Sequence, residues 1–143
     1  MKIMAIDYGD ARTGFAISDR SEFLASPIGT VPERNAERLA DKAAQTAAEY
    51  GAGEIIVGLP INMNGTEGPR AEKCRAFAEL LKERTALPVR MWDERSTTVT
   101  AHNILNETNV RGKARKAVVD TVAATIILEG YLEYRRKKAK QAD

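Results

Sequence analysis

The 143-residue sequence predicts an α/β fold with a mixed five-stranded sheet flanked by helices. Short apolar runs of strand length come first in a group of three, and later runs alternate with helical patterns. Strands joined by short turns pair antiparallel, whereas strands joined by helices pair parallel. We therefore expect three antiparallel strands followed by parallel ones.

Three strands are predicted before the first helix. Residues 2–7 form an apolar run that ends in Asp7, and residues 13–18 follow after a turn that contains glycine. A third, shorter strand at 28–31 follows Pro27. The short connections predict an antiparallel meander.

Helices and strands alternate in the next part of the chain. An alanine-rich stripe at helical spacing predicts a helix over 33–50, and a second helical pattern covers 70–85. Apolar runs at 54–57 and 88–92 predict the fourth and fifth strands. The segment 58–69 is rich in proline, asparagine and glycine, which predicts a loop.

Two more helices are predicted after the fifth strand. Ser96 or Thr97 can cap a helix that runs to about residue 107, and the last helix covers 114–134. A basic tail follows at 135–143, where five basic residues accompany one acid. This tail is expected either to hold RNA or DNA electrostatically or to be a solvated helix end whose cations suit the helix dipole.

The composition is that of a globular protein, with 43% hydrophobic and 29% charged residues and a formal net charge of +2. No apolar stretch is long enough to cross a bilayer, and the first residues lack the pattern of a signal peptide. The single cysteine, Cys74, excludes an internal disulfide. We expect a cytoplasmic protein with a core in one domain.

Three acids, Asp7, Glu94 and Asp120, stand where solubility alone does not explain a carboxylate. Asp7 ends the first strand, Glu94 lies just past the fifth, and Asp120 sits in a helix among small and apolar residues. Carboxylates at strand ends and on a buried helix face repel one another unless cations lie between them. The pattern favours a divalent-metal site.

Two of these assignments have alternatives. Lys116, four residues before Asp120, could form a surface ion pair with it, but such a pair does not explain the apolar helix face. Glu94 has an acidic neighbour, Asp93, and side chains alternate along a strand, so regular β geometry lets only one of them face the site.

Four segments carry a family resemblance: Ile6-Asp7-Tyr8-Gly9-Asp10-Ala11-Arg12-Thr13-Gly14, Gly58-Leu59-Pro60-Ile61-Asn62-Met63-Asn64-Gly65, Asp93-Glu94-Arg95-Ser96-Thr97-Thr98 and Asp120-Thr121-Val122-Ala123-Ala124. In this order they resemble the YqgF family, also called RuvX, whose members are known as pre-16S rRNA nucleases and Holliday-junction-resolvase-like proteins. The resemblance implies an RNase H-like nuclease domain over residues 1–134, a bacterial cytoplasmic location and trimming of the 5′ end of the small-subunit ribosomal RNA precursor.

The same resemblance implies a two-metal mechanism. Asp7 would bridge two Mg²⁺ or Mn²⁺ ions, and Glu94, which the family pattern favours over Asp93, would complete the metal shells together with Asp120. Two such ions promote in-line hydrolysis of a phosphodiester bond.

Several residues are candidates for substrate binding. The guanidinium groups of Arg12 and Arg95 match phosphate oxygens, although either could instead neutralise a neighbouring carboxylate. Thr97 and Thr98 could contact the phosphates of the nucleic-acid backbone, although one of them could instead cap a helix. The 62–68 loop, with Asn62 and Asn64, could lie against nucleic acid or could be only a turn. A basic cluster beside Asp120 contains Arg111, Lys113 and Lys116 and could attract the substrate. Trp92 and the tyrosines are expected in the core or at its rim, because basic residues do not interleave with them in the sequence.

Rival functions remain at this point. The substrate could be branched DNA, for which a junction resolvase would need a two-fold homodimer, or precursor ribosomal RNA, with ribosomal proteins as possible partners. The sequence leaves open whether the protein is a monomer or a homodimer. The chain could also be a non-catalytic factor that binds nucleic acid or protein. An ATP site at the Asp7-x-Gly9 turn would require a second domain or a partner chain.

Overall fold

The computed structural model describes residues 1–95 and 112–142, and the side chains of 112–121 and 141–142 lie outside the described set. Its centre is a five-stranded sheet in the order β3-β2-β1-β4-β5. The first three strands pair antiparallel, whereas β1 with β4 and β4 with β5 pair parallel, which confirms the predicted mixed sheet. The strand bounds are β1 Lys2–Asp7, β2 Arg12–Ser18, β3 Ala25–Pro32, β4 Ala52–Leu59 and β5 Val89–Asp93.

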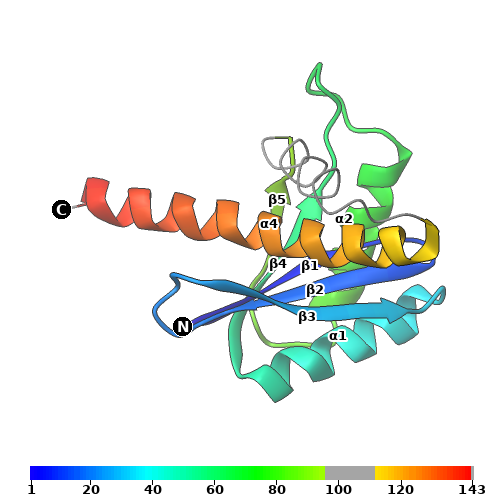
Figure 1. Ribbon diagram of the computed structural model, residues 1–143, viewed down its shortest axis with the longest axis horizontal. Helices are drawn as coiled ribbons and strands as arrows, with labels where there is room; N and C mark the ends of the chain where they lie inside the picture. Colours follow the sequence, from blue (N-terminus) through cyan, green and yellow to red (C-terminus); the bar gives the residue numbers. More distant parts are fainter. Residues whose placement is uncertain (96–111, 143) are drawn as a thin grey trace.

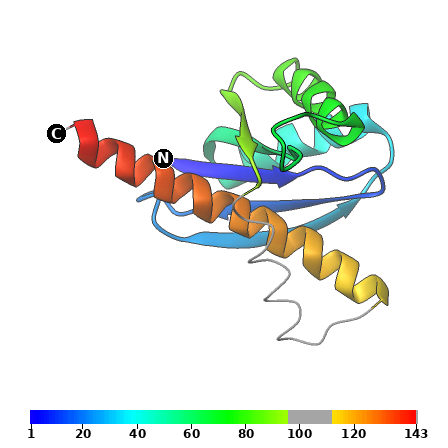
Figure 2. The ribbon, with the colours of Figure 1, turned by 90° about the horizontal axis from the view of Figure 1, so that it is seen from above.

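Helices cover both faces of the sheet, so the molecule has three layers (Figures 1 and 2). One face packs against α1 (Ala36–Tyr50) and α2 (Pro69–Lys82), and this core contains Met4, Ile6 and Phe77. The other face packs against α4 (Gly112–Ala142), whose C-terminal end projects past the sheet in Figure 2. Within the described ranges, no helix has both the length and the apolar character needed to span a membrane.

The predicted bounds of the third strand and of the first helix differ from the structure. The third strand has eight residues instead of four, because it pairs with β2 along its whole length, from Arg12 with Pro32 to Ser18 with Ala25. The first helix starts at Ala36, where the Asn35 side chain accepts a hydrogen bond from the Arg38 backbone N–H at 2.9 Å. The predicted helix over 96–107 lies outside the described residues.

The last helix continues to Ala142 instead of ending near Tyr134. Its first residues past Tyr134 contact the turn between β2 and β3, where Glu22 accepts a hydrogen bond from Arg135 Nε at 2.5 Å. The backbone carbonyl of Glu22 also accepts from Arg136 at 3.2 Å. The first residues of the predicted basic tail are therefore bound to the body of the protein.

A buried carboxylate ties α4 to the two parallel strands beside it. Glu54 of β4 is only 2% exposed, on the face that α4 covers. It accepts hydrogen bonds from Arg90 Nε of β5 at 2.6 Å and from the Tyr131 hydroxyl of α4 at 2.9 Å. Arg135 Nη1 lies 3.7 Å from the same carboxylate. Two hydrogen-bond donors and one further cation thus fix how the helix lies over these strands.

We predict that Phe77→Ala destabilises the protein by about 3–5 kcal/mol, the usual cost of deleting a buried aromatic ring. Phe77 is 1% exposed, and its ring stacks on that of Tyr8 with the centroids 4.7 Å apart. Phe23→Ala is the matched control, because Phe23 is 65% exposed, and it should cost less than about 1 kcal/mol. Urea unfolding measures the stability of both variants. Equal losses of unfolding free energy would contradict the assignment of Phe77 to the core.

Candidate functional site

Asp7 ends β1 on the side of the sheet that α4 covers. Side chains alternate along this strand: Ile3 and Ala5 belong to the core beneath α4, whereas Met4 and Ile6 belong to the core beneath α1 and α2. The same alternation directs Asp7 towards α4. Its carboxylate is therefore at the carboxyl end of a central strand, where α/β proteins place functional groups.

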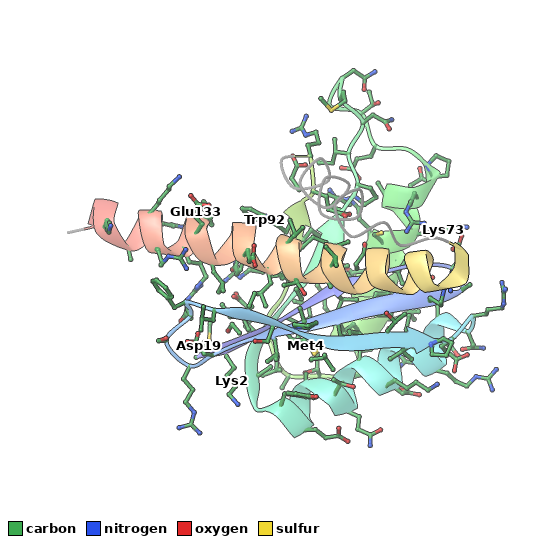
Figure 3. The ribbon with its side chains drawn as sticks, in the orientation of Figure 1. Lys2, Met4, Asp19, Lys73, Trp92 and Glu133 are labelled. Atoms are coloured by element: carbon green, nitrogen blue, oxygen red, sulfur yellow. The ribbon has the colours of Figure 1, made fainter. Side chains whose placement is uncertain are left out.

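Glycines flank Asp7 on both neighbouring strands. Asp7 is paired with Gly14 of β2, and the parallel register of Ile6 with Val57 makes Gly58 its neighbour on β4. Because neither glycine has a side chain, groups from other elements can approach the sheet surface on either side of the Asp7 carboxylate. Lys73, which forms an ion pair with Asp10 at 3.3 Å, marks this end of the sheet in Figure 3, and Asp19 marks the opposite end.

Glu94 lies on the same face as Asp7. Its backbone N–H donates to the Leu59 carbonyl at 3.2 Å, which extends the pairing of β4 and β5 by one step. A Cβ atom added at Gly58 would lie 2.9 Å from Glu94 Cδ and 2.7 Å from Ile127 Cδ1. The Glu94 carboxyl group is thus packed between β4 and α4, directly over Gly58.

Asp93, the acidic neighbour, has a different environment. Arg95 binds it with Nη2 at 2.7 Å and with its backbone N–H at 3.0 Å. The hydrogen bond from Arg95 lowers the pKa of the Asp93 carboxyl below its ordinary value. Of the two acids, Glu94 is the one beside Gly58, and Arg95 is bound to a neighbouring carboxylate, one of the two roles the sequence left open for it.

Burial changes the ionisation of Glu94. Loss of water around the carboxyl group raises its pKa, the charge of Arg70 lowers it, and the charge of Asp93 raises it again. Burial also raises the pKa of the nearby Cys74 thiol to about 12, with Arg70 opposing the shift and Glu94 and Asp7 adding to it. Two carboxylates and one guanidinium therefore act on the same small region.

Arg70 is a functional candidate that the sequence analysis missed. It lies in the first turn of α2, and its Nη2 donates to the Tyr8 carbonyl at 2.9 Å. This contact joins residues 62 positions apart and puts a cation beside the turn that follows Asp7. An arginine at the start of a helix carries no local signal for such a contact, so only the three-dimensional structure finds it.

The third predicted acid is only partly located. Position 120 lies on α4, four residues before the buried Ala124 and seven before Ile127, so it shares the helical stripe that packs on the sheet. The Asp120 side chain itself lies outside the described set. Among the side chains that are described, no three His, Cys, Asp or Glu residues form a metal-binding group. The metal triad remains a prediction.

The predicted substrate-binding residues have different outcomes. Asn62 and Asn64 form the 62–66 turn, where Thr66 Oγ1 accepts from Asn62 Nδ2 at 3.0 Å and donates to Asn64 Oδ1 at 2.6 Å. Arg12 begins β2 at the end of the sheet where Asp7 lies. Thr97, Thr98 and Arg111 lie outside the described residues, and Lys113 and Lys116 lie on α4 with side chains outside the described set. Substrate binding by all of these residues stays a prediction.

The donor atoms of the site suit a hard divalent cation. Asp7 and Glu94 offer carboxylate oxygens, the ligands that Mg²⁺ and Mn²⁺ prefer. The one soft donor nearby, Cys74, is 2% exposed, and its raised pKa keeps the thiol protonated at neutral pH. The missing side chain at Gly58 lets the Glu94 carboxyl group come close to the strand that lies beside Asp7. The residues present therefore fit such an ion.

The strand order and the mixed strand pairing define the class as an RNase H-like α/β fold. The RuvC protein of Thermus thermophilus, bound to a Holliday junction substrate, superimposes with a TM-score of 0.58 at 11% identity, over 95% of this chain and 96% of that one. A fowlpox virus Holliday junction resolvase superimposes with a TM-score of 0.55 at 17% identity, over 94% of this chain and 99% of that one. At these identities the likeness concerns the fold alone.

Sequence comparison identifies the family. The family model described as "RuvX: Holliday junction resolvase" matches residues 1–134. A protein of Halothermothrix orenii named "Putative pre-16S rRNA nuclease" is 45% identical over 137 residues, which is 96% of this chain and 98% of the relative. A protein of the same name from Clostridium novyi is 44% identical over 93% of this chain and 98% of the relative. The chain belongs to the RuvX family, as the four sequence motifs indicated.

We predict that Gly58→Ala destabilises the protein by about 1–3 kcal/mol, because the new methyl group would overlap Ile127 and Glu94. Gly68→Ala is the matched control: the nearest atom to its added Cβ, Asn62 Nδ2, is 3.8 Å away, an ordinary contact. Thermal or urea unfolding compares the two variants. A Gly58 variant as stable as the Gly68 variant would show that Glu94 does not pack over Gly58.

We further predict that Glu94→Gln stabilises the metal-free protein at pH 8. The raised pKa means that ionising Glu94 costs folding free energy, so the advantage of glutamine should appear as the pH rises above about 4.5 and level off above the folded-state pKa. Asp93→Asn is the control of opposite sign, because a lowered pKa stabilises the fold above about pH 3.8. Melting temperatures of the two variants and the wild type are measured in chelator between pH 4 and 8. A Glu94→Gln variant that melts below the wild type at pH 8 would contradict the prediction for Glu94.

Proposed function

We propose that this protein is a metal-dependent nuclease that hydrolyses phosphodiester bonds at the 5′ end of the precursor of 16S ribosomal RNA. The observation that carries the proposal is the position of Asp7 and Glu94 on one face of the sheet, with Gly58 between them. The curated relatives at 45% and 44% identity, both named for this RNA, support the choice of substrate.

Asp7 and Glu94, with Asp120 from α4, are the residues that would hold Mg²⁺ or Mn²⁺. Such ions, when bound, activate water and neutralise the leaving oxygen in an in-line displacement. The protein's part is to hold these carboxylates in place before the substrate arrives. Arg70 contributes to this, because its charge lowers the pKa of Glu94 against the effect of burial and favours the ionised, metal-binding form.

The location and partners follow from the substrate. Precursor ribosomal RNA exists in the bacterial cytoplasm, so the enzyme would act there, and ribosomal proteins on that RNA would be its neighbours. A single active site suffices to trim one end of one strand, which is compatible with a monomer.

A second candidate substrate is a four-way DNA junction. The family description names Holliday junction resolvase activity, and the RuvC protein that shares the fold was solved with such a junction. Paired cuts in a symmetric junction require two active sites related by a two-fold axis, and therefore a homodimer. Substrate choice and oligomeric state would change together.

We predict that Asp7→Asn lowers cleavage of a precursor 16S RNA fragment in Mn²⁺ or Mg²⁺ by at least about a hundredfold, because it weakens a charged metal ligand. Asp10→Asn is the matched control: Asp10 is three residues away, is 58% exposed and binds Lys73 at the surface, so its loss should change the rate by less than about threefold. Mapping the cleaved ends by gel electrophoresis gives both the rate and the position of the cut.

A synthetic four-way junction in parallel reactions separates the two substrates. Cleavage of the RNA at the mature 5′ end, sensitive to Asp7→Asn, supports the proposal. Symmetric cuts in the junction would favour the resolvase. If Asp7→Asn and the wild type cleave equally, the acids are not the catalytic centre.

A further inference from the structure

A cavity of about 510 Å³ lies between β5 and the C-terminal half of α4, and neither Asp7 nor Glu94 is among the described residues that line it. Three aromatic rings and three basic side chains line it: Trp92, Tyr131, Tyr134, Arg90, Arg135 and Lys138. Figure 3 shows Trp92 beside α4. The volume is in the range of pockets that hold small ligands.

The aromatic residues form one contiguous cluster. The ring centroid of Trp92 lies 5.4 Å from those of both Tyr131 and Tyr134. Tyr131 is 5% exposed and forms the floor, whereas Tyr134 is 45% exposed and stands at the rim. Trp92 Nε1 is buried and, within the described part of the chain, is the one such side-chain atom that lacks a hydrogen-bond partner. A buried donor without an acceptor is a cost to folding, and such a group in a native structure is often found at a functional site.

The basic residues differ in how far they are already engaged. Arg135 is bound to Glu22 and lies near Glu54, so its charge is already balanced and it forms part of the cavity wall. Arg90 uses Nε to bind Glu54, but its side chain is 63% exposed and, among the described residues, its terminal nitrogens form no hydrogen bond. Lys138 Nζ lies 5.8 Å from the centre of the Tyr134 ring and forms no ion pair with any described residue. Two cations at the rim are therefore available to an anion.

We propose that this cavity binds an unpaired nucleotide of a single-stranded nucleic acid, with its base against Trp92 and Tyr134 and its phosphate held by Arg90 and Lys138. Aromatic faces stack on bases of any sequence, and basic side chains beside them bind the backbone. Paired bases keep their faces covered by the bases above and below, so a duplex cannot enter the cluster.

The cavity adjoins the candidate active site. Trp92 precedes Glu94 by two residues on the same strand face, a distance of about 7 Å along a β-strand. Tyr131 follows Ile127, which contacts Gly58, by one helical turn, about 6 Å along the axis. A strand with a phosphate at Asp7 and Glu94 would thus have a neighbouring nucleotide in the cavity. This last step rests on the proposed function, whereas nucleotide binding in the cavity does not.

The test uses Trp92 as its own probe, because it is the only tryptophan in the chain. The full-length protein in EDTA, which prevents cleavage, is titrated with twelve-residue oligouridylate and oligothymidylate while tryptophan fluorescence is recorded. We expect quenching by one or both oligomers, and their relative affinity tells whether the cavity prefers RNA or DNA. A duplex of equal length should leave the fluorescence unchanged.

Two variants separate the roles within the cavity. Tyr134→Ala removes a stacking surface and should weaken binding by about five- to a hundredfold. Lys138→Ala should weaken it and reduce the slope of log affinity against log salt concentration by about one. The matched controls are Tyr50→Ala, an exposed tyrosine at the end of α1, and Lys137→Ala, which lies on α4 outside this cavity. Both controls should bind within about twofold of the wild type.

The outcomes are distinct from those of the nuclease test. Binding without any fluorescence change, or equal affinity of the Tyr134 and Tyr50 variants, would overturn the cavity as a nucleotide site even if the protein cleaves RNA. Quenching that Tyr134→Ala abolishes would establish the site even if Asp7→Asn shows the protein not to be a nuclease.

Discussion

The Glu54 carboxylate is buried beneath α4, and the arrangement of the whole functional face depends on how that charge is balanced. Moving a carboxylate out of water is costly unless hydrogen bonds and opposite charges replace the lost solvation. Here Arg90 of β5 and Tyr131 of α4 donate to it, and Arg135 lies 3.7 Å away. A shift of the helix by one turn would take Tyr131 and Arg135 away from this charge and leave only Arg90, so a single register of α4 on the sheet is strongly favoured.

That one register positions everything else on this face. With Tyr131 at Glu54, Ile127 comes to lie against Gly58 and Glu94, and position 120 comes two turns earlier on the same stripe. In the other direction, Tyr134 and Lys138 come to lie beside Trp92. The candidate active site and the aromatic cavity are therefore the two ends of one helix–sheet contact.

The sequence predicts most of this fold because periodicity reports burial directly. Alternation in 2–7 indicates which side chains share a face, and the order of strands and helices determines which pairs are parallel. The length of β3 was underestimated because an edge strand with few buried residues has no clear apolar run, and its extent is set by β2. Arg70 could not be predicted, since its contact with Tyr8 joins two loop-proximal positions far apart in the chain.

The aromatic cavity escaped sequence analysis for a related reason. Arg90 and Trp92 alternate with the period of a strand, whereas Tyr131, Tyr134 and Lys138 repeat with the period of a helix, and about forty positions separate the two sets. Neither segment alone shows aromatic and basic residues interleaved as in a nucleic-acid-binding motif. The interleaving arises only when α4 lies across β5. Tyr131 and Trp92 do lie in the core and at its rim, as expected, but basic side chains surround them in space.

The two glutamates on this face, Glu54 and Glu94, differ in a way that bears on function. Glu54 accepts hydrogen bonds from Arg90 of β5 and Tyr131 of α4, and these bonds join the helix to the sheet. Its charge therefore has a structural role. Glu94 has a raised pKa because the desolvation around it outweighs the charge of Arg70, and its ionised form therefore lowers the stability of the metal-free protein. A residue selected only for folding would be expected to avoid such a cost, whereas a cation bound between Glu94 and Asp7 would remove it. The desolvation of the Glu94 carboxyl group is thus an argument, independent of any family resemblance, in favour of the proposed cation site at the carboxyl ends of β1 and β5.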